Sequence, residues 1–345
     1  MAGLTLLRAG GSARAFGLAL GRFGRPAVPA LVATSAWKTV TVQAESAFVQ
    51  GMAQQVRATF PAIWDEISGL AEGLGLPLAE VFAWNCRGDI WAAAPDGCTT
   101  VMMPGPPHVL AHNEDGLPVL APHCGLVEAR PGNGPDFVSF VYPGSIPGHA
   151  FAVNAAGLTI TVNNIRPAGA GDGLPRMVLG RALLGVERIG QAVAMMRRLP
   201  RAGGFHFALA QAGEDRLISL EFCGKDVSAR DISVPEAHAN HMIHEAMRGL
   251  EQTITESSGC RQARADALLG ADPLEILRDR AGPGLPILRL AEDDPDTENT
   301  IATARFEVGE AVTGTVHLPG QPAPAYRMTA DRRARTVTLA AADPL

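Results

Sequence analysis

Pro95-Asp96-Gly97-Cys98-Thr99-Thr100 is the stretch that says most about how this chain folds. Pro-Asp-Gly is typical of a tight turn, and a Cys followed by two β-branched residues indicates the start of a buried strand. The thiol is therefore predicted to begin a strand, directly after a glycine that has no side chain to hinder attack on its carbonyl. This layout suits an enzyme that cuts its own backbone between Gly97 and Cys98 and then uses the freed Cys98 as both nucleophile and base.

The composition is that of a globular protein with a large core. The 345 residues are 47% hydrophobic and 19% charged, which allows one large domain or two ordinary ones. A net charge of -6, with basic runs as short as Arg197-Arg198 and Arg332-Arg333, argues against nucleic acid as a partner. Five cysteines without CxxC spacing are typical of a reducing compartment, so a cytoplasmic location is expected. No apolar run approaches the roughly 18 residues of a membrane span, and no membrane partner is expected.

The first 44 residues contain five basic side chains and no acidic one. The basic residues are Arg8, Arg14, Arg22, Arg25 and Lys38. This composition resembles a transit peptide, and the alternative is a folded segment of an Ala/Arg-rich protein. We favour the folded segment, and Arg14 interrupts the apolar stretch that a secretory signal would need.

Residues 45–84 predict three helices. Pro61 separates the first helix from the second, and the second and third cover residues 62–74 and 77–84. Apolar side chains recur at helical spacing at Phe48, Met52 and Val56 in the first helix, and at Ile63, Ile67 and Leu70 in the second. These helices are interpreted as architectural.

From residue 98 the pattern changes to that of strands. The predicted strands are 98–103, 109–113, 150–153, 158–162, 205–211, 217–222, 300–308, 314–318 and 326–339. Helical patterns return at 176–199 and 258–280, and the acidic stretch 292–298 predicts a surface loop. Blocks of antiparallel hairpins separated by helices favour an α+β layered fold over a parallel βαβ sheet.

The first hairpin brings a carboxylate toward the thiol. With its turn centred between Gly105 and Pro106, Cys98 lies opposite Asn113, and Asp115 lies two residues further on the same face. Cleavage before Cys98 would expose an α-amino group, whose ordinary pKa of about 7.7 to 8.0 suits a base at neutral pH. Asp115 could hold that amine and stabilise the ammonium, or could be a plain turn residue.

Two segments resemble a known family. Residues 60–73, with the sequence FPAIWDEISGLAEG, resemble its helix motif, and Asn85-Cys86-Arg87 followed by 96–100 resembles its processing site. The family is the acyl-CoA:6-aminopenicillanate acyltransferase and carcinine hydrolase group of N-terminal-nucleophile enzymes, which are related to choloylglycine hydrolases. The resemblance implies a four-layer αββα sandwich of two antiparallel sheets, made as a precursor. It also implies self-cleavage into residues 1–97 and 98–345, which stay together as one domain.

The same resemblance assigns site residues. Cys98 matches the nucleophile, Gly97 the residue before the scissile bond, and Asp115 the aspartate that follows the nucleophile strand. Asn154, in an Asn-x-x-Gly-Leu turn, and Asn240, in His-Ala-Asn-His, match asparagines that bind the tetrahedral oxygen. Asn-x-x-Gly is also ordinary hairpin chemistry, so Asn154 could serve the turn alone.

The chain departs from the family at three points. Glu114 and Gly116 stand where several members have tryptophan, which predicts a different substrate pocket. The late arginine of the family has no clear counterpart, and Arg305 is the candidate.

The predicted function is hydrolysis of a small N-acyl or peptide-like amide through an acyl-Cys98 intermediate. The alternative is transfer of the acyl group from a thioester or amide to an amine. No cofactor or metal is expected, the cleaved N-terminal chain is the expected protein partner, and a homo-oligomer is left open.

Two other classes of function were weighed. A zinc hydrolase could use the histidines and the cysteine at His108, His112, His123, Cys124, His238, His241 and His244. However, i and i+4 positions are far apart on a strand, and no HExxH helix is present. A non-catalytic binding module that keeps the fold is the other alternative. The four remaining cysteines, Cys86, Cys124, Cys223 and Cys260, are assigned to packing.

Overall fold

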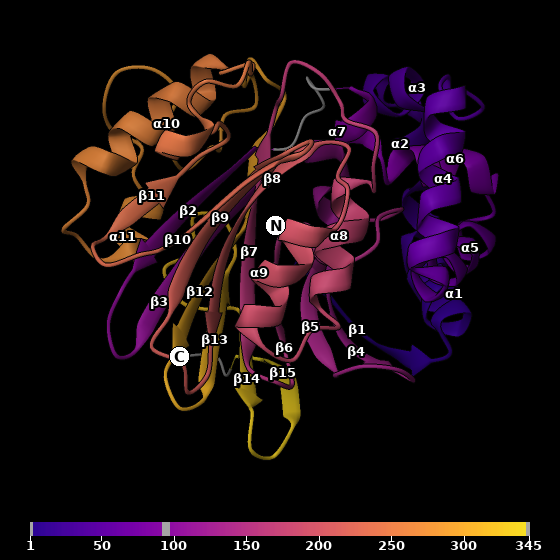
Figure 1. Ribbon diagram of the computed structural model, residues 1–345. Helices are drawn as coiled ribbons and strands as arrows, with labels where there is room; N and C mark the ends of the chain where they lie inside the picture. Colours follow the sequence, from indigo (N-terminus) through magenta and orange to yellow (C-terminus); the bar gives the residue numbers. More distant parts are fainter. Residues whose placement is uncertain (1–2, 92–96, 343–345) are drawn as a thin grey trace.

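The computed structural model describes residues 3–91 and 97–342. Two β-sheets are stacked face to face, and helices cover both outer faces, so the chain forms four layers in the order α, β, β, α (Figure 1). This confirms the predicted sandwich. The turn residues Pro95 and Asp96, from which the sequence argument began, lie outside the described residues.

The first sheet has eight strands in the order β1-β4-β5-β6-β7-β8-β9-β10. Their bounds are β1 Thr5–Gly11, β4 Gly125–Pro131, β5 Phe137–Val141, β6 Phe151–Asn154, β7 Leu158–Ile165, β8 Gly204–Gln211, β9 Leu217–Cys223 and β10 Asp226–Asp231. β1 runs parallel to β4, and the other pairs are antiparallel. The prediction of purely antiparallel sheets is therefore wrong at this one pair. The long connection from β1 to β4 makes a parallel pairing possible.

The second sheet has seven strands in the order β11-β2-β3-β12-β13-β14-β15. Their bounds are β11 Glu236–His238, β2 Gly97–Met103, β3 His108–Gly116, β12 Asn299–Val308, β13 Val312–His317, β14 Tyr326–Asp331 and β15 Thr336–Ala341. A core of apolar side chains, including Phe140, Phe151 and Phe306, fills the space between the sheets. At one end of β2 and β3 polar side chains replace this apolar filling, and the candidate site lies there.

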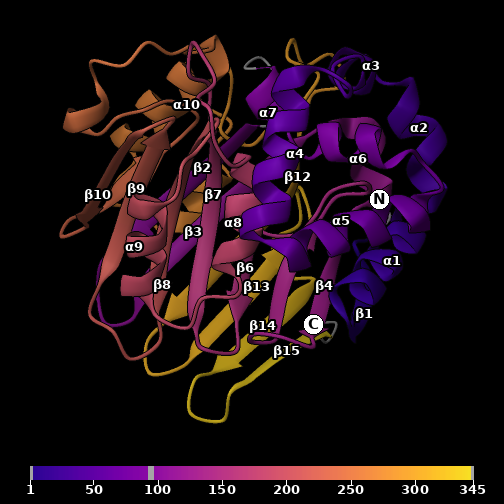
Figure 2. The ribbon, with the colours of Figure 1, turned by 45° about the vertical axis from the view of Figure 1, so that its right-hand side comes forward.

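Helices α1 to α9 pack with the first sheet (Figure 2). Helices α10 and α11 cover the second sheet (Figure 1). The bounds of the helices are α1 Ala13–Gly24, α2 Val28–Ala33, α3 Ser35–Thr41, α4 Ala47–Thr59, α5 Pro61–Leu74, α6 Leu78–Trp84, α7 Arg87–Ile90, α8 Arg176–Leu183, α9 Ile189–Arg198, α10 Glu256–Ala267 and α11 Pro273–Leu277. Short 3-10 turns cover Arg25–Ala27, Pro118–His123 and Glu245–Met247. Among the described residues, no helix is long and apolar enough to cross a membrane.

The predicted N-terminal helices are confirmed, with one error of face. α4, α5 and α6 match the predicted segments, and the break falls at Pro61. Phe48 is 39% exposed, however, and Val49 takes its place in the core. Residues 5–41 form β1 and α1 to α3, as expected of a folded segment.

The acidic stretch 292–298 is not simply a surface loop. Asp294 and Glu298 are buried, and both form ion pairs with the fully buried Arg289. The prediction is confirmed for the other five residues, which are exposed. It is wrong for Asp294 and Glu298, because these carboxylates are the counter-ions of an internal arginine, and a buried charge needs a partner.

Helices α1 and α5 touch backbone to backbone through glycines. A methyl group on Gly17 would lie 1.9 Å from the carbonyl oxygen of Glu66, and one on Gly69 would lie 2.1 Å from that of Arg14. Gly21 and Gly73 are as tightly packed in the same contact. The close approach of the two helices therefore depends on residues without a Cβ.

Gly17→Ala is expected to lower the free energy of unfolding by about 2 kcal/mol or more, because the helices must move apart to admit the methyl group. Denaturant unfolding of the variant and the wild type measures the difference. Gly190→Ala in α9 is the matched control, since a Cβ there meets nothing within 4 Å, and it should be neutral or slightly stabilising. Equal stability of the Gly17→Ala variant and the wild type would contradict the packing described.

Candidate active site

The β2–β3 hairpin has a register that differs by one residue from the prediction. Cys98 lies opposite Glu114, and Gly97 lies opposite Asp115. The predicted pair of Cys98 with Asn113 is wrong, because five residues, 104–108, separate the last pair, Met103 and Val109, where an even number was assumed. A shift of one residue moves every side chain to the other face of the sheet.

The register places the thiol and Asp115 on opposite faces. The side chain of Cys98 shares its face with Glu114 and Thr100, and this face looks toward the first sheet. Asp115 lies on the face covered by α10 and α11, where its Oδ1 accepts a hydrogen bond from Thr300 at 2.7 Å. Its Oδ2 is buried and has no partner among the described residues. Burial raises the pKa of Asp115, although nearby arginines oppose this shift.

Glu114, which the sequence argument connected only with the substrate pocket, faces the thiol. Its Oε2 lies 3.6 Å from Cys98 Sγ and 3.0 Å from His112 Nε2, and its Oε1 accepts a hydrogen bond from Tyr142 at 2.8 Å. All four side chains are buried. Burial lowers the pKa of His112 to about 3, so the imidazole is neutral at neutral pH.

The backbone of Cys98 is held by two side chains. Its N–H donates to Asn240 Oδ1 at 2.9 Å, and its carbonyl accepts from Arg261. Arg261 also donates to Asn240 Oδ1 at 2.7 Å and to Thr99 Oγ1 at 2.9 Å. The predicted site residue Asn240 is thus beside Cys98, joined by an arginine that the sequence argument missed.

Helix α10 fixes the position of Arg261. Its first turn is capped by the Thr255 side chain, which accepts from the N–H of Ser258. Ser257 accepts a hydrogen bond from Arg261 Nε at 3.0 Å, and Ser258 Oγ accepts one from the N–H of Asn240 at 2.9 Å. One helix end therefore orients both groups that hold Cys98.

Arg305, the predicted late arginine, is not part of this arrangement. It lies opposite Ala111 in the middle of the β3–β12 pair, and it forms an ion pair with Glu307 at 2.7 Å. The structure supplies Arg261 in its place. The available signal was the short distance in sequence between Asn240 and Arg261. That signal alone does not distinguish Arg261 from the other arginines of the chain.

Asn154 is not brought to Cys98. Its Oδ1 accepts from the N–H groups of Ala156 and Leu158, and its Nδ2 donates to the carbonyls of Leu184 and Val186. These contacts hold the turn before β7. Asn240 instead donates to the carbonyl of Asn164 near the other end of β7, about 20 Å along the strand. The geometry gives Asn154 a turn role, and the predicted role at the tetrahedral oxygen has no support from it.

Of the histidines predicted as an alternative metal site, His112 alone belongs to a compact group of possible metal ligands among the described residues. Within residues 3–91 and 97–342, one compact group of possible ligands occurs, in which atoms of Cys98, His112 and Glu114 lie within 4.8 Å of one another. Two of these atoms already share a hydrogen bond, and Thr100 and Tyr142 complete the contacts of His112 and Glu114. We interpret the group as a set of hydrogen-bonded side chains and not as a metal site.

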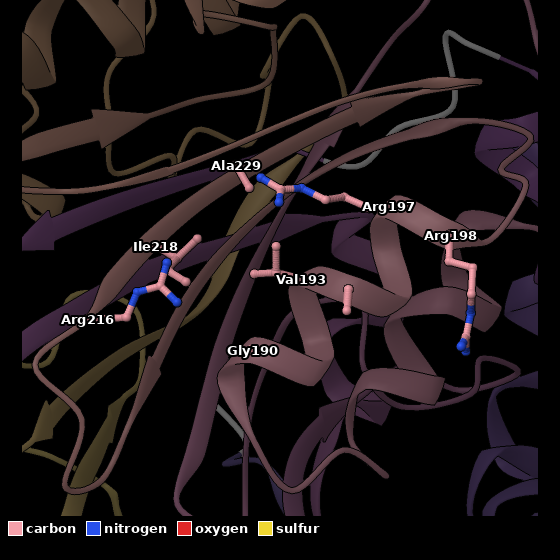
Figure 3. A pocket seen from close by; sticks show the side chains of 8 residues that line it. Gly190, Val193, Arg197, Arg198, Arg216, Ile218 and Ala229 are labelled. Atoms are coloured by element: carbon pink, nitrogen blue, oxygen red, sulfur yellow. The ribbon is translucent and has the colours of Figure 1, made fainter.

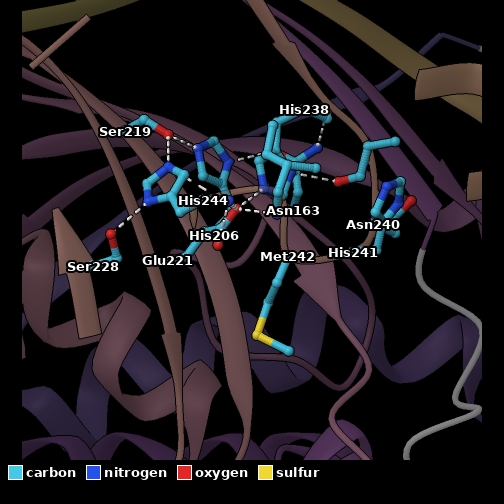
Figure 4. Close-up of polar contacts among 12 residues, drawn as sticks. Asn163, His206, Ser219, Glu221, Ser228, His238, Asn240, His241, Met242 and His244 are labelled. Carbon is cyan, nitrogen blue, oxygen red and sulfur yellow. Dashed lines mark hydrogen bonds and ion pairs between the residues drawn. The ribbon is translucent and has the colours of Figure 1, made fainter. Parts of the chain in front are cut away.

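A buried network of histidines joins β8 and β9 of the first sheet to His238 on β11 of the second (Figure 4). The rings of His206 and His238 stack with centroids 3.7 Å apart, and Glu221 lies 2.9 Å from His238. Ser219 Oγ lies 2.9 Å from His206 Nε2 and 2.8 Å from His244 Nε2. Burial lowers the pKa of His206 well below its ordinary value and that of His244 to about 4.

These shifts predict a loss of stability in acid. Folding lowers the pKa of His244. The contribution of His244 to the free energy of unfolding is therefore fully present when the pH is above its ordinary pKa of about 6.5, and it is lost as the pH falls toward 4. Wild type is therefore expected to lose about 2 kcal/mol more than His244→Gln between about pH 7 and about pH 5, measured by denaturant unfolding. Parallel pH profiles for wild type and His244→Gln would contradict the prediction.

Two cavities differ in their relation to the site. One of about 490 Å³ lies between α9 and strands β9 and β10, lined by arginines and apolar side chains (Figure 3). It is on the helix-covered side of the first sheet, whereas Cys98 belongs to the second. The other, of about 200 Å³, adjoins the site through Arg261. Its lining residues are Arg166, Thr253, Thr255, Ser257, Arg261, Asp296 and Glu298.

The four layers, two stacked sheets between helices, are those of the N-terminal-nucleophile class of enzymes. The chain belongs to the acyl-coenzyme A:6-aminopenicillanic acid acyl-transferase family, whose model matches residues 102–317. The match begins just after Cys98, so the role of this thiol is argued from geometry. Membership of this family makes the protein an enzyme of the acyltransferase class.

Comparison with solved structures gives a distant likeness. The structure of penicillin V acylase from Agrobacterium tumefaciens is similar over 65% of this chain and 84% of that chain, with 12% identity and a TM-score of 0.38. A comparison with curated proteins gave no match.

Proposed function

We propose that this chain is an amidohydrolase that matures by cutting its own Gly97–Cys98 bond and then hydrolyses small N-acyl amides through an acyl-Cys98 intermediate. The observation that carries the proposal is the set of hydrogen bonds that position Cys98. Its N–H and its carbonyl are bound by Asn240 and Arg261, and its thiol faces a carboxylate. A packing cysteine has no need of such contacts.

Cleavage would turn the backbone nitrogen of Cys98 into an amine beside its own thiol. This amine takes the thiol proton and so activates the nucleophile. Asn240 Oδ1, which already accepts from this nitrogen, would keep it in place. Asp115, opposite Gly97, has a buried Oδ2 without a partner among the described residues, and that oxygen suits the new ammonium group.

Two amide groups suit the tetrahedral oxygen. Asn240 Nδ2 spends one hydrogen on the carbonyl of Asn164, and the other remains for a substrate. The side-chain nitrogen of Asn164 is buried and has no partner within the part of the chain that the structure describes. One donor of this kind stabilises the transition state by about 3 to 4 kcal/mol.

The cavity beside Arg261 supports a small polar substrate. It measures about 200 Å³, and hydroxyl and charged groups line it, including Thr255 and Arg166. Acyl transfer to an amine is the second candidate, and the description of the family favours it. Partition of the acyl-enzyme between water and an added amine separates the two reactions.

Intact mass spectrometry of the purified wild-type protein tests the proposal. Two polypeptides, residues 1–97 and 98–345, are expected to elute together under native conditions and apart after denaturation. A wild-type protein that is catalytically active and still one polypeptide would refute self-cleavage, and with it the role of the amine as base.

A further inference from the structure

One buried side chain, Asn163, fixes the direction of the hydrogen bonds that lead to the thiol. Its Nδ2 donates to the carbonyl of His238 at 3.0 Å, which leaves its Oδ1 to accept. Thr100 Oγ1 donates to this oxygen at 2.7 Å, and His206 Nδ1 lies 3.0 Å from it. Because an amide oxygen only accepts, the single hydroxyl proton of Thr100 is committed to Asn163.

This commitment sets the tautomer of His112. Thr100 Oγ1 lies 2.9 Å from His112 Nδ1 and, with its proton given away, must accept there. His112 therefore carries its proton on Nδ1 and a lone pair on Nε2. That lone pair points at Glu114 Oε2, 3.0 Å away, so a proton that reaches this oxygen is hydrogen-bonded to His112 at once.

The thiol of Cys98 lies at the same oxygen and has a proton to give, 3.6 Å away. Tyr142 donates to the other oxygen of Glu114, and burial raises the pKa of Tyr142 well above its ordinary value, so the phenol stays a donor. Glu114 is thus placed between a proton donor, Cys98, and a group that stabilises the proton once received, His112.

We propose that Glu114, with His112 behind it, is the general base that activates Cys98 for self-cleavage, before any free amine exists. The inference rests on the proposed function, since it concerns how the precursor matures. Asp115 is a poor rival, since it lies on the other face of the sheet, bound to Thr300.

The reaction requires no reactant other than water. Glu114 Oε2 takes the thiol proton, and Sγ forms a bond to the carbonyl carbon of Gly97, whose oxygen receives the π electrons. Collapse of this intermediate breaks the bond from that carbon to the Cys98 nitrogen, which takes the proton back from Glu114. Water then hydrolyses the thioester to the carboxylate of Gly97 and the free thiol, and the proton released with the carboxylate goes to the new α-amine of Cys98.

The proposal separates maturation from turnover. In the cut enzyme the amine of Cys98 lies next to its own thiol and can take the proton, so Glu114 is no longer needed as a base. Loss of its basicity should therefore slow cleavage far more than it slows the chemistry of sites that have been cut.

Glu114→Gln is the test, because glutamine keeps the contacts and removes the base. Its amide oxygen can accept from Tyr142, and its N–H can donate to the lone pair of His112. The full chain is made by cell-free translation, and the cleaved fraction is followed with time on denaturing gels. The first-order rate constant of cleavage is expected to fall at least about 100-fold, the lower end of what a general base contributes.

The second readout is chemistry at cut sites. With p-nitrophenyl acetate as the probe, the burst rate per cleaved chain should fall less than about tenfold in Glu114→Gln. Glu221→Gln, which removes another buried carboxylate hydrogen-bonded to a histidine, is the matched control and should cleave at the wild-type rate. Thermal unfolding of both variants confirms that they are folded.

Each other outcome overturns a distinct claim. If wild type and Glu114→Gln cleave equally fast, Glu114 is not the base, although the proposed function stands. If cleavage is unchanged and the burst is lost, Glu114 acts in turnover instead. If Glu221→Gln slows cleavage as much as Glu114→Gln, the effect is a general one of buried charge. If wild type itself is never cleaved, the proposed function fails first.

Discussion

Cys98→Ala is expected to yield a folded, single polypeptide of 345 residues that has no measurable amidase activity. The change removes the sulfur that attacks both the chain itself and the substrate, so cleavage and turnover are lost together. Removal of a nucleophile costs about 10⁴-fold or more in turnover. Intact mass and release of p-nitroaniline from N-acyl p-nitroanilides measure the two losses.

Two further variants show that the thiol itself is responsible. Cys98→Ser keeps an attacking oxygen, but its hydroxyl is far less acidic, so slow, incomplete cleavage is expected. Cys223→Ala removes a half-buried cysteine at the end of β9, away from the segments that resemble the processing site, and should be cleaved normally. A Cys98→Ala protein that still separates into two chains would place the scissile chemistry elsewhere.

Asn240→Ala is expected to reduce turnover of a cut enzyme by about 10² to 10³-fold. The variant loses the acceptor for the Cys98 nitrogen, the partner of Arg261, and the amide hydrogen proposed for the tetrahedral oxygen. Steady-state kinetics on N-acyl p-nitroanilides, expressed per cleaved chain, measure the effect. A lower kcat with little change in KM is expected, because the oxygen carries its charge in the transition state.

Asn154→Ala is the matched control for this experiment. Both asparagines are fully buried, but Asn154 holds a turn at the far end of β7. Asn154→Ala should therefore lower stability and leave turnover per folded site unchanged. Wild-type kinetics for Asn240→Ala, or a loss of turnover in Asn154→Ala, would exchange the roles assigned to the two residues.

The hairpin that starts at Cys98 shows how far the sequence reaches and where it stops. β-branched residues and a turn motif were enough to predict the strand and the place of the thiol. The face was not predictable, because one extra residue in the turn 104–108 changes the register and exchanges Asp115 for Glu114 beside the sulfur. Turn length in a Pro-rich loop is not encoded in any pattern of apolar residues.

Arg261 could not be predicted for a different reason. It reaches Cys98 across 163 positions of sequence, from a helix that packs on the outer face of the second sheet. Nothing in its local sequence distinguishes it from the arginines on the surface. Its role follows from tertiary packing, as does that of Arg289 and its buried carboxylates.

Strong local periodicity was a reliable guide elsewhere. α4, α5 and α6 follow from their apolar spacing and from Pro61. The strands that were missed are β1, β4, β5, β10 and β11. Their pairing is decided by the neighbours they meet in the sheet, which is information from far along the chain.

β1 runs in the first sheet alongside β4, and α1 packs against that same sheet, although both precede the proposed cut by many residues. An uncut precursor that unfolds remains a single polypeptide and can refold by a first-order process. Once severed, the two polypeptides would diffuse apart on denaturation, and recovery would become a bimolecular encounter. The apparent stability of the mature enzyme would then rise with its own concentration, whereas that of the precursor would not.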